Sequence, residues 1–483
     1  MAAKEAPYAV ANIRKSELKQ FSCSGQELPF LLSRTPGILA WSENGIGTGT
    51  TYMRIRGAAG SRINVTLDGV ALNSPEDQTV FWANMNSYSS LLGSIQVQRG
   101  VGSSTNGDGA FGGSISMATA APSLTPTAEV TGSFGSYNTY HTGASFSTGL
   151  LGKHLIFDGA YHETATDGYV DGTAGRSGSY YGGLTWLGDN FKISYKNIGN
   201  FEKTGQAWSG VLGGDYNSNF TLLEDGIRTY KDMYKAGLDK FNVLTGDLVR
   251  NGKGDYTITP YTCATEANGT RLLITSIRTT TSFRLPGHQA ATGATASHCI
   301  TPMATATTRS LRTTPSLPSS DSFTRMQKAT RLRSLTSSAR RGLTQHTYGM
   351  VYNTNYKDEH WDVIGGLNLQ QFRGNHWGYL TYIANQDAEK KFFGSNGKYK
   401  YYDSDAHKYD YSAFAKASYR FADYWNAFAD LQYRRVEYKT DGINDKFIAQ
   451  ADGSYKNQEL NINEKYNFFN PKAGISFNKD GHK

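Results

Sequence analysis

The chain has 483 residues, which is long for one soluble core because single domains usually contain roughly 100–200 residues. Its 53 glycines and 31 tyrosines stand beside 12 prolines and a mean hydropathy of −0.51, so the chain is rich in glycine and aromatic residues without being apolar overall. It has no run of about 18 apolar residues, which excludes a membrane-spanning helix. Membrane insertion would require a closed β-barrel, which pairs all strand backbone groups.

The N-terminal sequence MAAKEAPYAV lacks a basic segment followed by an apolar one, so no secretion signal is visible. The three cysteines, Cys23, Cys263 and Cys299, form no CxxC pair and have no zinc-like spacing. They therefore predict neither a metal site nor a disulfide framework.

Residues 1–121 contain short strand-like runs bounded by Gly, Asn or Asp, as in a small mixed α/β domain. Five segments follow one another in this region: LLSRTPGI, MRIRG, INVTLDGVALN, LLGSIQVQRGVGSS and GDGAFGGSISMAT. A single segment would carry little weight, because Asp-Gly turns after strands are common. In this order and spacing they resemble the plug domain of TonB-dependent outer-membrane receptors.

The resemblance implies an N-terminal α/β plug inside an antiparallel membrane β-barrel, with 22 strands in the family. It implies binding and transport without catalysis and without a cofactor. The expected partners are TonB with its inner-membrane energising complex, outer-membrane lipid and a small-molecule ligand such as a metal chelate. No nucleic acid is expected. The expected location is the outer membrane of a Gram-negative bacterium, with the signal peptide missing by truncation.

The plug motifs supply residues with structural or gating roles. Arg56 and Arg99 end strands, where a guanidinium group can bind carboxylates of a surrounding barrel wall. Glycines at these motifs permit turns and close backbone approach, and for most motif residues we expect a purely architectural role. The motif residues are Arg54, Arg56, Gly57, Asp68, Gly69, Arg99, Gly100, Gly112 and Gly113.

The segment SPEDQTVFWANMNSY combines aromatic and amide side chains, which suit an adaptable binding surface. In the resembled family such plug loops rise towards the external mouth. Packing of these aromatic residues against the barrel wall is an equally good interpretation. The candidate substrate contacts are Trp82, Asn84, Asn86 and Tyr88, with Tyr169 and Trp208 in expected external loops.

The segment around Pro7, Tyr8, Ala9 and Val10 is the candidate TonB box, since an extended apolar strand can add to the edge of a partner's sheet. It departs from the familiar box, and the alternative is that it forms the first strand of the plug.

Residues 125–261 and 346–483 show the two-residue period of barrel strands. In DYSAFAKASYRF, beginning at Asp410, one face carries alanines between aromatic residues and the other carries polar residues. The following segment YWNAFADLQYRR repeats this scheme. Alternation with aromatic residues at both ends of an apolar band is typical of transmembrane β-strands.

Residues 262–345 differ from both neighbours. They contain no Tyr or Trp, and between Cys263 and Gln345 eleven Arg and Lys residues face two acidic residues, so this segment accounts for the whole net charge of +8. A basic Ser/Thr-rich stretch is ordinarily a disordered linker. Our hypothesis is that it is translated out of frame, and we expect no strands in it.

The remaining barrel segments suffice for roughly twelve strands, which predicts a truncated fragment of the 22-stranded barrel. The sequence contains no GxSxG or HExxH motif, so an enzyme is not expected. The predicted function is active uptake of a scarce nutrient, with an iron-siderophore or cobalamin as the favoured cargo. The alternatives are a passive porin or adhesin-type barrel, or an importer of glycans or peptides.

Overall fold

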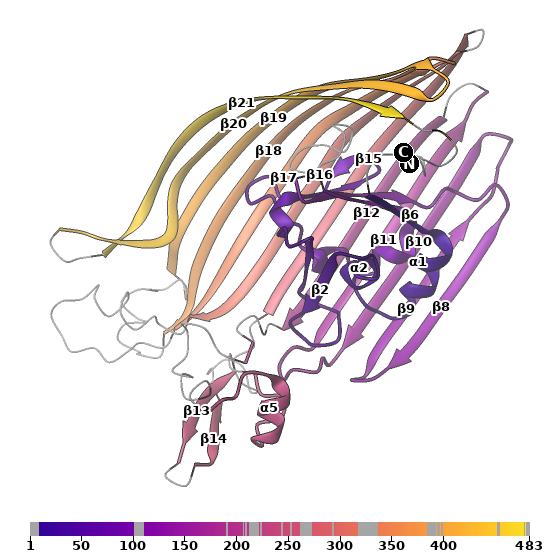
Figure 1. Ribbon diagram of the computed structural model, residues 1–483. Coiled ribbons are helices and arrows are strands. Elements are labelled where there is room, and N and C mark those ends of the chain that lie inside the picture. The colour runs from indigo at the N-terminus through magenta and orange to yellow at the C-terminus, as the bar shows by residue number, and fades with distance from the viewer. Residues whose placement is uncertain are drawn as a thin grey trace.

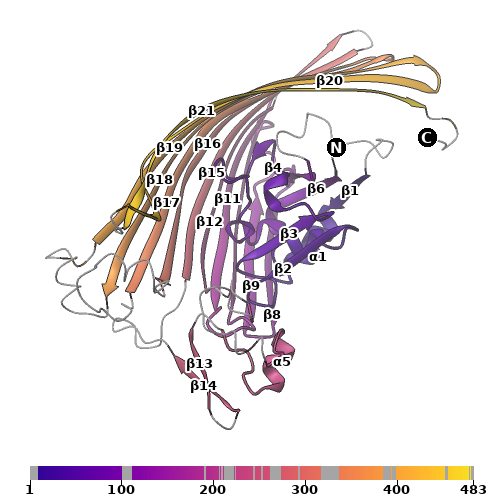
Figure 2. The same cartoon turned by 60° about the vertical axis from the view of Figure 1, so that its left-hand side comes forward.

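A small domain lies on the concave side of one large curved sheet in the computed structural model (Figures 1 and 2). No helix among the described residues is long and apolar enough to span a membrane. The structure describes residues 9–100, 111–189, 192–205, 207, 210–211, 222, 225–242, 245–251, 254–260, 273–291, 294–316, 337–383, 393, 397, 399–451, 455–477 and 479.

The plug combines short strands with short helices, as its glycine-punctuated sequence predicts. Its sheet has the order β1-β6-β7-β4-β5, in which only β4 and β7 pair in parallel, and β2 and β3 form a separate hairpin. Its elements are β1 (Ala9–Arg14), α1 (Lys15–Ser22), α2 (Leu28–Leu32), β2 (Ile38–Ser42), β3 (Thr51–Ile55), η1 (Gly60–Arg62), β4 (Ile63–Leu67), β5 (Val70–Ala71), η2 (Trp82–Met85), α3 (Tyr88–Leu91), β6 (Leu92–Arg99) and β7 (Gly113–Thr119).

One hydrophobic core holds the plug together. It joins the sheet to the helices through residues such as Leu18, Ile55, Ile95 and Ile115, all of which are fully buried. The wall also contributes, because Ile198 belongs to the same core. Plug and wall therefore share apolar surface as well as polar contacts.

The wall is a 12-stranded antiparallel sheet in which every strand pairs with its neighbours in chain order, from β8 at one edge to β21 at the other. The predicted fold, an α/β plug followed by an incomplete antiparallel barrel, is confirmed. The strands are β8 (Thr127–Gly135), β9 (Thr139–Ser147), β10 (Leu155–Thr166), β11 (Gly175–Leu187), β12 (Lys192–Gly205), β15 (Leu273–Ala291), β16 (Ala294–Ser316), β17 (Ser337–Lys357), β18 (Trp361–Ile383), β19 (Tyr399–Ala422), β20 (Trp425–Ala449) and β21 (Tyr455–Phe477).

The predicted alternation gives the wall two different faces. On β19, Tyr409 and Tyr411 are 37% and 39% exposed, whereas Lys408 and Asp410 on the plug side are 7% and 4% exposed. The aromatic side chains thus cover the outer face, as transmembrane strands require. The charged side chains face the plug.

The connections also alternate. Short turns such as residues 358–360 and 423–424 lie at one end of the wall, and longer connections such as residues 167–174 and the excursion between β12 and β15 lie at the other. The excursion contains α5 (Tyr230–Lys235) and the hairpin of β13 (Gly246–Arg250) and β14 (Tyr256–Pro260), which project beyond the sheet (Figure 1). We call the end of the wall with the longer connections the loop end.

Within residues 262–345 the structure places β15, β16 and the first part of β17, paired antiparallel with their neighbours. The structure therefore has strands in a segment where the sequence favoured none. Strand pairing uses backbone groups, so it does not require the aromatic alternation that the segment lacks. The wall has twelve strands only when β15 and β16 are counted. The other segments supply fewer strands than the sequence predicted, because β18 to β21 are 23–25 residues long.

Candidate functional site

Glu76, in the plug loop of residues 74–79, is bound by three strands of the wall. Its carboxylate accepts hydrogen bonds from His376 Nε2 at 2.8 Å, Gln345 Nε2 at 3.3 Å and the Tyr438 hydroxyl at 3.1 Å. These partners lie on β18, β17 and β20. Because donors from separate strands converge on one side chain, the loop is fixed to the wall rather than merely adjacent to it.

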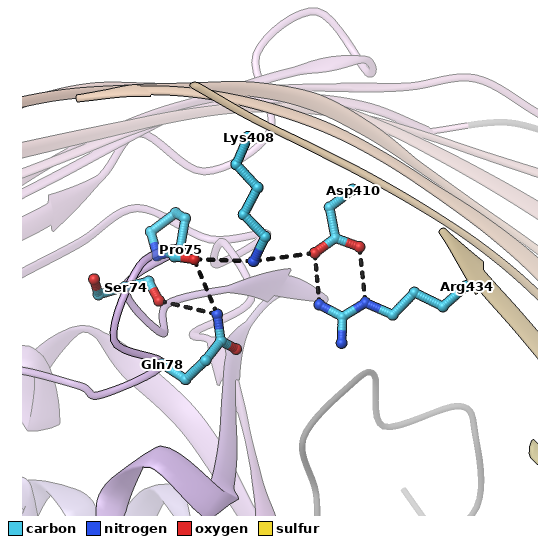
Figure 3. Close-up of polar contacts among 6 residues, drawn as sticks. All are labelled: Ser74, Pro75, Gln78, Lys408, Asp410 and Arg434. Carbon is cyan, nitrogen blue, oxygen red and sulfur yellow. Dashed lines mark hydrogen bonds and ion pairs between the residues drawn. The ribbon is translucent and has the colours of Figure 1, made fainter. Parts of the chain in front are cut away.

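A second attachment lies beside Glu76 (Figure 3). Lys408 Nζ donates to the backbone oxygen of Pro75 at 2.9 Å and lies 3.4 Å from Asp410 Oδ2. Arg434 binds Asp410 through two hydrogen bonds of 2.8 and 2.5 Å. This charged triad orients Lys408 towards the plug, because a bidentate Arg–carboxylate pair fixes the geometry of both groups.

A cavity of about 210 Å³ separates the plug from strands β17 to β20 next to this triad. Its lining is rich in side-chain amides, with Asn64 and Asn73 from the plug and Asn353, Gln370 and Gln432 from the wall. Amide groups both donate and accept hydrogen bonds, so this cavity can solvate a polar solute. The loop of residues 74–79 contributes Pro75 and Gln78 to the same lining.

The turn between β4 and β5 makes a third attachment. Asp68 and Gly69 both have positive φ, at 51° and 87°, which favours Gly and is tolerated by Asp. Asp68 Oδ2 lies 2.7 Å from Lys196 Nζ of β12 and also accepts from Thr119 Oγ1. Burial raises the pKa of the Asp68 carboxyl, but Lys196 and the Thr119 hydrogen bonds outweigh this and hold the pKa below its usual range.

At the loop end, the plug hairpin of residues 43–50 meets the longer connections of the wall. Asn44 O accepts a hydrogen bond from Tyr169 N at 2.9 Å, and Glu43 Oε2 accepts from Ala207 N at 3.2 Å. The Tyr169 ring packs edge-on against Tyr230 at 6.1 Å. Burial, with Glu43 nearby, raises the pKa of Tyr230 to about 12, so its hydroxyl remains a hydrogen-bond donor at neutral pH.

Lys240 completes an aromatic cluster at this end. Its Nζ lies 5.4 Å from the ring centroid of Tyr137 and 5.7 Å from that of Tyr169, within the range of a cation–π interaction. Tyr169, one of the two ligand residues predicted in the connecting loops, therefore lies at the loop end beside the plug. Trp208 lies outside the described residues.

Three of the predicted plug-loop residues, Trp82, Asn86 and Tyr88, are buried. Trp82 is 5% exposed and belongs to the plug core, and Tyr88 is 1% exposed with its hydroxyl 3.5 Å from Asn200 Oδ1. Asn86 donates to Ser177 Oγ on β11. The backbone of Asn84 lies in η2. These positions correspond to the packing interpretation of the loop, and a binding role for them is tested below.

The plug motif residues mainly shape the plug itself. Arg99 donates to Pro36 O at 2.8 Å, and Arg54 lies over the Trp41 ring. Arg56 is exposed with a φ of 48°. Gly57, which follows Arg56, and Gly100, which follows Arg99, both have positive φ. Within the described part of the chain neither Arg56 nor Arg99 forms an ion pair with a wall carboxylate.

Close packing explains why positions 112 and 113 are both glycine. A Cβ added at Gly112 would lie 2.4 Å from Ala58 Cβ, and one at Gly113 would lie 2.5 Å from Gln98 O. The close approach of β7 to its neighbours therefore excludes larger residues there.

Only two of the four residues of the candidate TonB box are described by the structure. Ala9 and Val10 belong to β1 and pair with Arg99 and Gln98 of β6, as the alternative interpretation expected. Pro7 and Tyr8 lie outside the described residues.

The sequence did not reveal the residues that attach the plug, namely Glu76, Lys196, His376, Lys408 and Arg434. Glu76 lies in the segment SPEDQTVFWANMNSY, which the sequence singled out for its aromatic and amide side chains. The other four residues lie on the polar face of alternating strands, a position that many other residues share. Among the described residues no group of three or more His, Cys, Asp or Glu side chains could hold a metal ion.

Residues 2–114 match the family model described as the TonB-dependent Receptor Plug Domain. No curated protein matches the sequence. Similar solved structures include the ferric-catecholate import receptor Fiu from E. coli K12, with a TM-score of 0.65 and 13% identity over 98% of this chain and 68% of that one. The ferric yersiniabactin uptake receptor FyuA from Yersinia pestis has a TM-score of 0.57 and 13% identity over 97% of this chain and 61% of that one.

The copper transporter OprC has a TM-score of 0.62 and 12% identity over 98% of this chain and 60% of that one. This chain thus spans between three fifths and about two thirds of the length of these neighbours. The neighbours are receptors and transporters, not enzymes. The match and the neighbours together confirm the resemblance: residues 2–114 match the plug domain of TonB-dependent receptors, and the chain has the fold of these solved receptors and transporters.

Proposed function

We propose that this chain belongs to an outer-membrane receptor that takes up a scarce small nutrient by TonB-dependent transport. The observation that carries the proposal is the attachment of the plug loop at Glu76 and Pro75 to the wall strands β17 to β20. A plug held to the wall by polar contacts and by apolar surface around Ile198, with a polar cavity beside it, can be displaced without unfolding the wall.

In this proposal the ligand first meets the loop end, where Tyr169 and the hairpin of residues 43–50 lie together. TonB binds the N-terminal segment and pulls on β1. Release of Glu76 and Pro75 from the wall then joins the polar cavity to the external side. The cavity amides replace water around a polar ligand as it passes.

The proposed cargo is a metal chelate such as an iron-siderophore. The three structural neighbours bear names that refer to ferric-catecholate import, ferric yersiniabactin uptake and copper transport. The cluster of Tyr137, Tyr169 and Lys240 offers aromatic faces beside a cation, a combination suited to anionic aromatic chelates. Cobalamin, glycans and peptides remain competing cargoes in the test.

A passive porin or adhesin is the second candidate, because the wall strands alone would permit it. The plug argues against a passive pore, since it occupies the concave side of the sheet and shares a hydrophobic core with it.

The test is growth of a strain lacking this receptor, with iron supplied only as a defined ferric siderophore. We expect the intact gene to restore growth only in the presence of TonB, and the Glu76→Ala variant to change uptake while barrel abundance stays the same. Asp77→Asn is the matched control, because the hydrogen bond that Asp77 Oδ1 accepts from Thr79 N, at 2.9 Å, stays within the loop. Uptake that persists without TonB would support the porin instead.

A further inference from the structure

Two buried carboxyl groups, one from the plug and one from β12, lie near enough for the charge of one to act on the other. Glu27, just before α2, is 1% exposed, and Glu202 of β12 is 2% exposed. Thr51 Oγ1 donates to Glu27 Oε2. Within the described part of the chain, Glu27 Oε1 and both carboxyl oxygens of Glu202 have no hydrogen-bond partner.

The charged groups on the surrounding strands do not neutralise this pair. Arg176 of β11 directs both of its described hydrogen bonds, of 2.9 and 2.8 Å, to Glu163 of β10. Lys203 follows Glu202 on the opposite, exposed face of β12. His141 of β9 is turned to Thr164 Oγ1, at 2.9 Å.

On the described part of the plug, the charge of no cation acts on Glu27. Glu43, on the hairpin next to this contact, is a further carboxylate and is bound to Tyr52 and to Ala207 N. Burial, together with the nearby Glu202, raises the pKa of Glu27 well above its usual range. Two uncompensated buried charges would cost many kcal/mol, so such groups normally become neutral instead.

The space beside Glu202 is too small for most counter-ions. The adjoining cavity has a volume of about 10 Å³ and is lined mainly by hydroxyl groups, including those of Thr48, Ser177 and Thr204. This volume holds about one water-sized particle, whereas Ca²⁺ needs six to eight oxygen ligands. A proton is the one neutralising species that needs no space.

We propose that Glu27 and Glu202 form an acid pair that keeps at least one proton while the plug is seated and releases it to water when plug and wall separate. Separation exposes both carboxyl groups to solvent, where a free Glu ionises near pH 4.3. Seating the plug therefore takes up protons. This inference concerns movement of the plug and holds whichever cargo the receptor carries.

The direction of the pH effect follows from proton linkage. The seated state binds more protons than the separated state, so the seated plug is fully stabilised at acidic pH. This stabilisation is lost as the pH rises through the raised pKa of the pair. A partner that pulls on the plug would consequently displace it more easily at alkaline pH.

The most direct test is infrared spectroscopy of the whole chain in detergent at neutral pH. We expect the carbonyl band of a protonated carboxylic acid, and we expect the Glu27→Gln and Glu202→Gln variants to weaken it. Gln has nearly the same shape as protonated Glu, and two single variants guard against one of them failing to fold. An unchanged band in both folded variants would overturn the proposal.

The second readout is the rate of hydrogen exchange in the hairpin of residues 43–50 between pH 6 and pH 9, corrected for intrinsic exchange. We expect opening in the wild type to rise by about tenfold, and by less than about twofold in either Gln variant. Glu129→Gln is the matched control, because Glu129 pairs the wall with Lys19 of the plug at the surface. A calcium-dependent change in opening that Glu202→Gln abolishes would show a cation site and refute the shared proton.

Discussion

The ion pair of Asp68 and Lys196 links plug to wall through two side chains that are only 9% and 13% exposed. Removing one partner leaves a buried charge unpaired, so we expect Lys196→Met to lower the free energy of unfolding by about 3 kcal/mol. The double variant Asp68→Asn/Lys196→Met should lose clearly less than the two single variants combined, because no charge remains unpaired. Denaturant unfolding in detergent measures all three values, and additive losses would show that the two groups do not interact.

The same pair predicts a pH dependence. Because the pKa of Asp68 is lowered in the folded protein, its stabilisation is present above the unfolded value of about 3.9 and is lost as the pH falls through the lowered pKa. The wild type should therefore lose this contribution below about pH 4. The Asp68→Asn variant should not show it, and a parallel acid titration of both proteins checks the difference.

A variant of Trp82 distinguishes the packing interpretation of the plug loop from the binding interpretation. It is 5% exposed within the plug core, so we expect Trp82→Ala to lower stability by about 3 kcal/mol or more and to reduce receptor abundance. Ligand affinity of the remaining receptor should be unchanged, and Trp82→Phe should restore most of the abundance. Normal abundance with weakened affinity would instead place Trp82 in the binding site.

At the scale of elements, β1 is the edge strand of the plug sheet through which a pull on the N-terminus must act. Among the described strands it pairs with β6 alone, and Asn12 faces Gln96 there with a side-chain hydrogen bond of 2.9 Å. A disulfide between Asn12→Cys and Gln96→Cys, with the native cysteines replaced by serine, should block transport by holding β1 in place. Reductant should restore uptake, and each single cysteine variant serves as its control. Full uptake with the disulfide formed would show that β1 does not detach from β6.

At the scale of the whole molecule, the wall has two strands between β12 and β17, and both come from residues 262–345. The side chains of this segment lack the Tyr-rich alternation on either side. We therefore expect another reading frame of the underlying DNA to encode glycine- and tyrosine-rich alternating sequence there. Sequencing and translation in all three frames is the measurement. If neither other frame gives such sequence, the segment is genuine and the reading-frame hypothesis is wrong.

The sequence by itself determined the plug and the two faces of the wall. The plug motifs lie close together in the chain, and alternation along β19 is a local property that follows from the two-residue period of a strand. It was therefore possible to predict that Tyr411 lies outside and Asp410 inside. It was also possible to predict the positive φ of the Asp68–Gly69 turn, because turn geometry depends on local residue types.

Only the tertiary structure decided which polar residues meet. Glu76 and His376 are 300 positions apart, and Glu27 and Glu202 lie on different bodies. Strand alternation shows which face of the wall a side chain occupies. It does not show how far along the wall the side chain lies or which plug residue it contacts. For the same reason the sequence could not show that Trp82 packs inward, since an aromatic loop suits a binding surface and a buried contact equally well. The register of twelve strands around the plug brings these residues together.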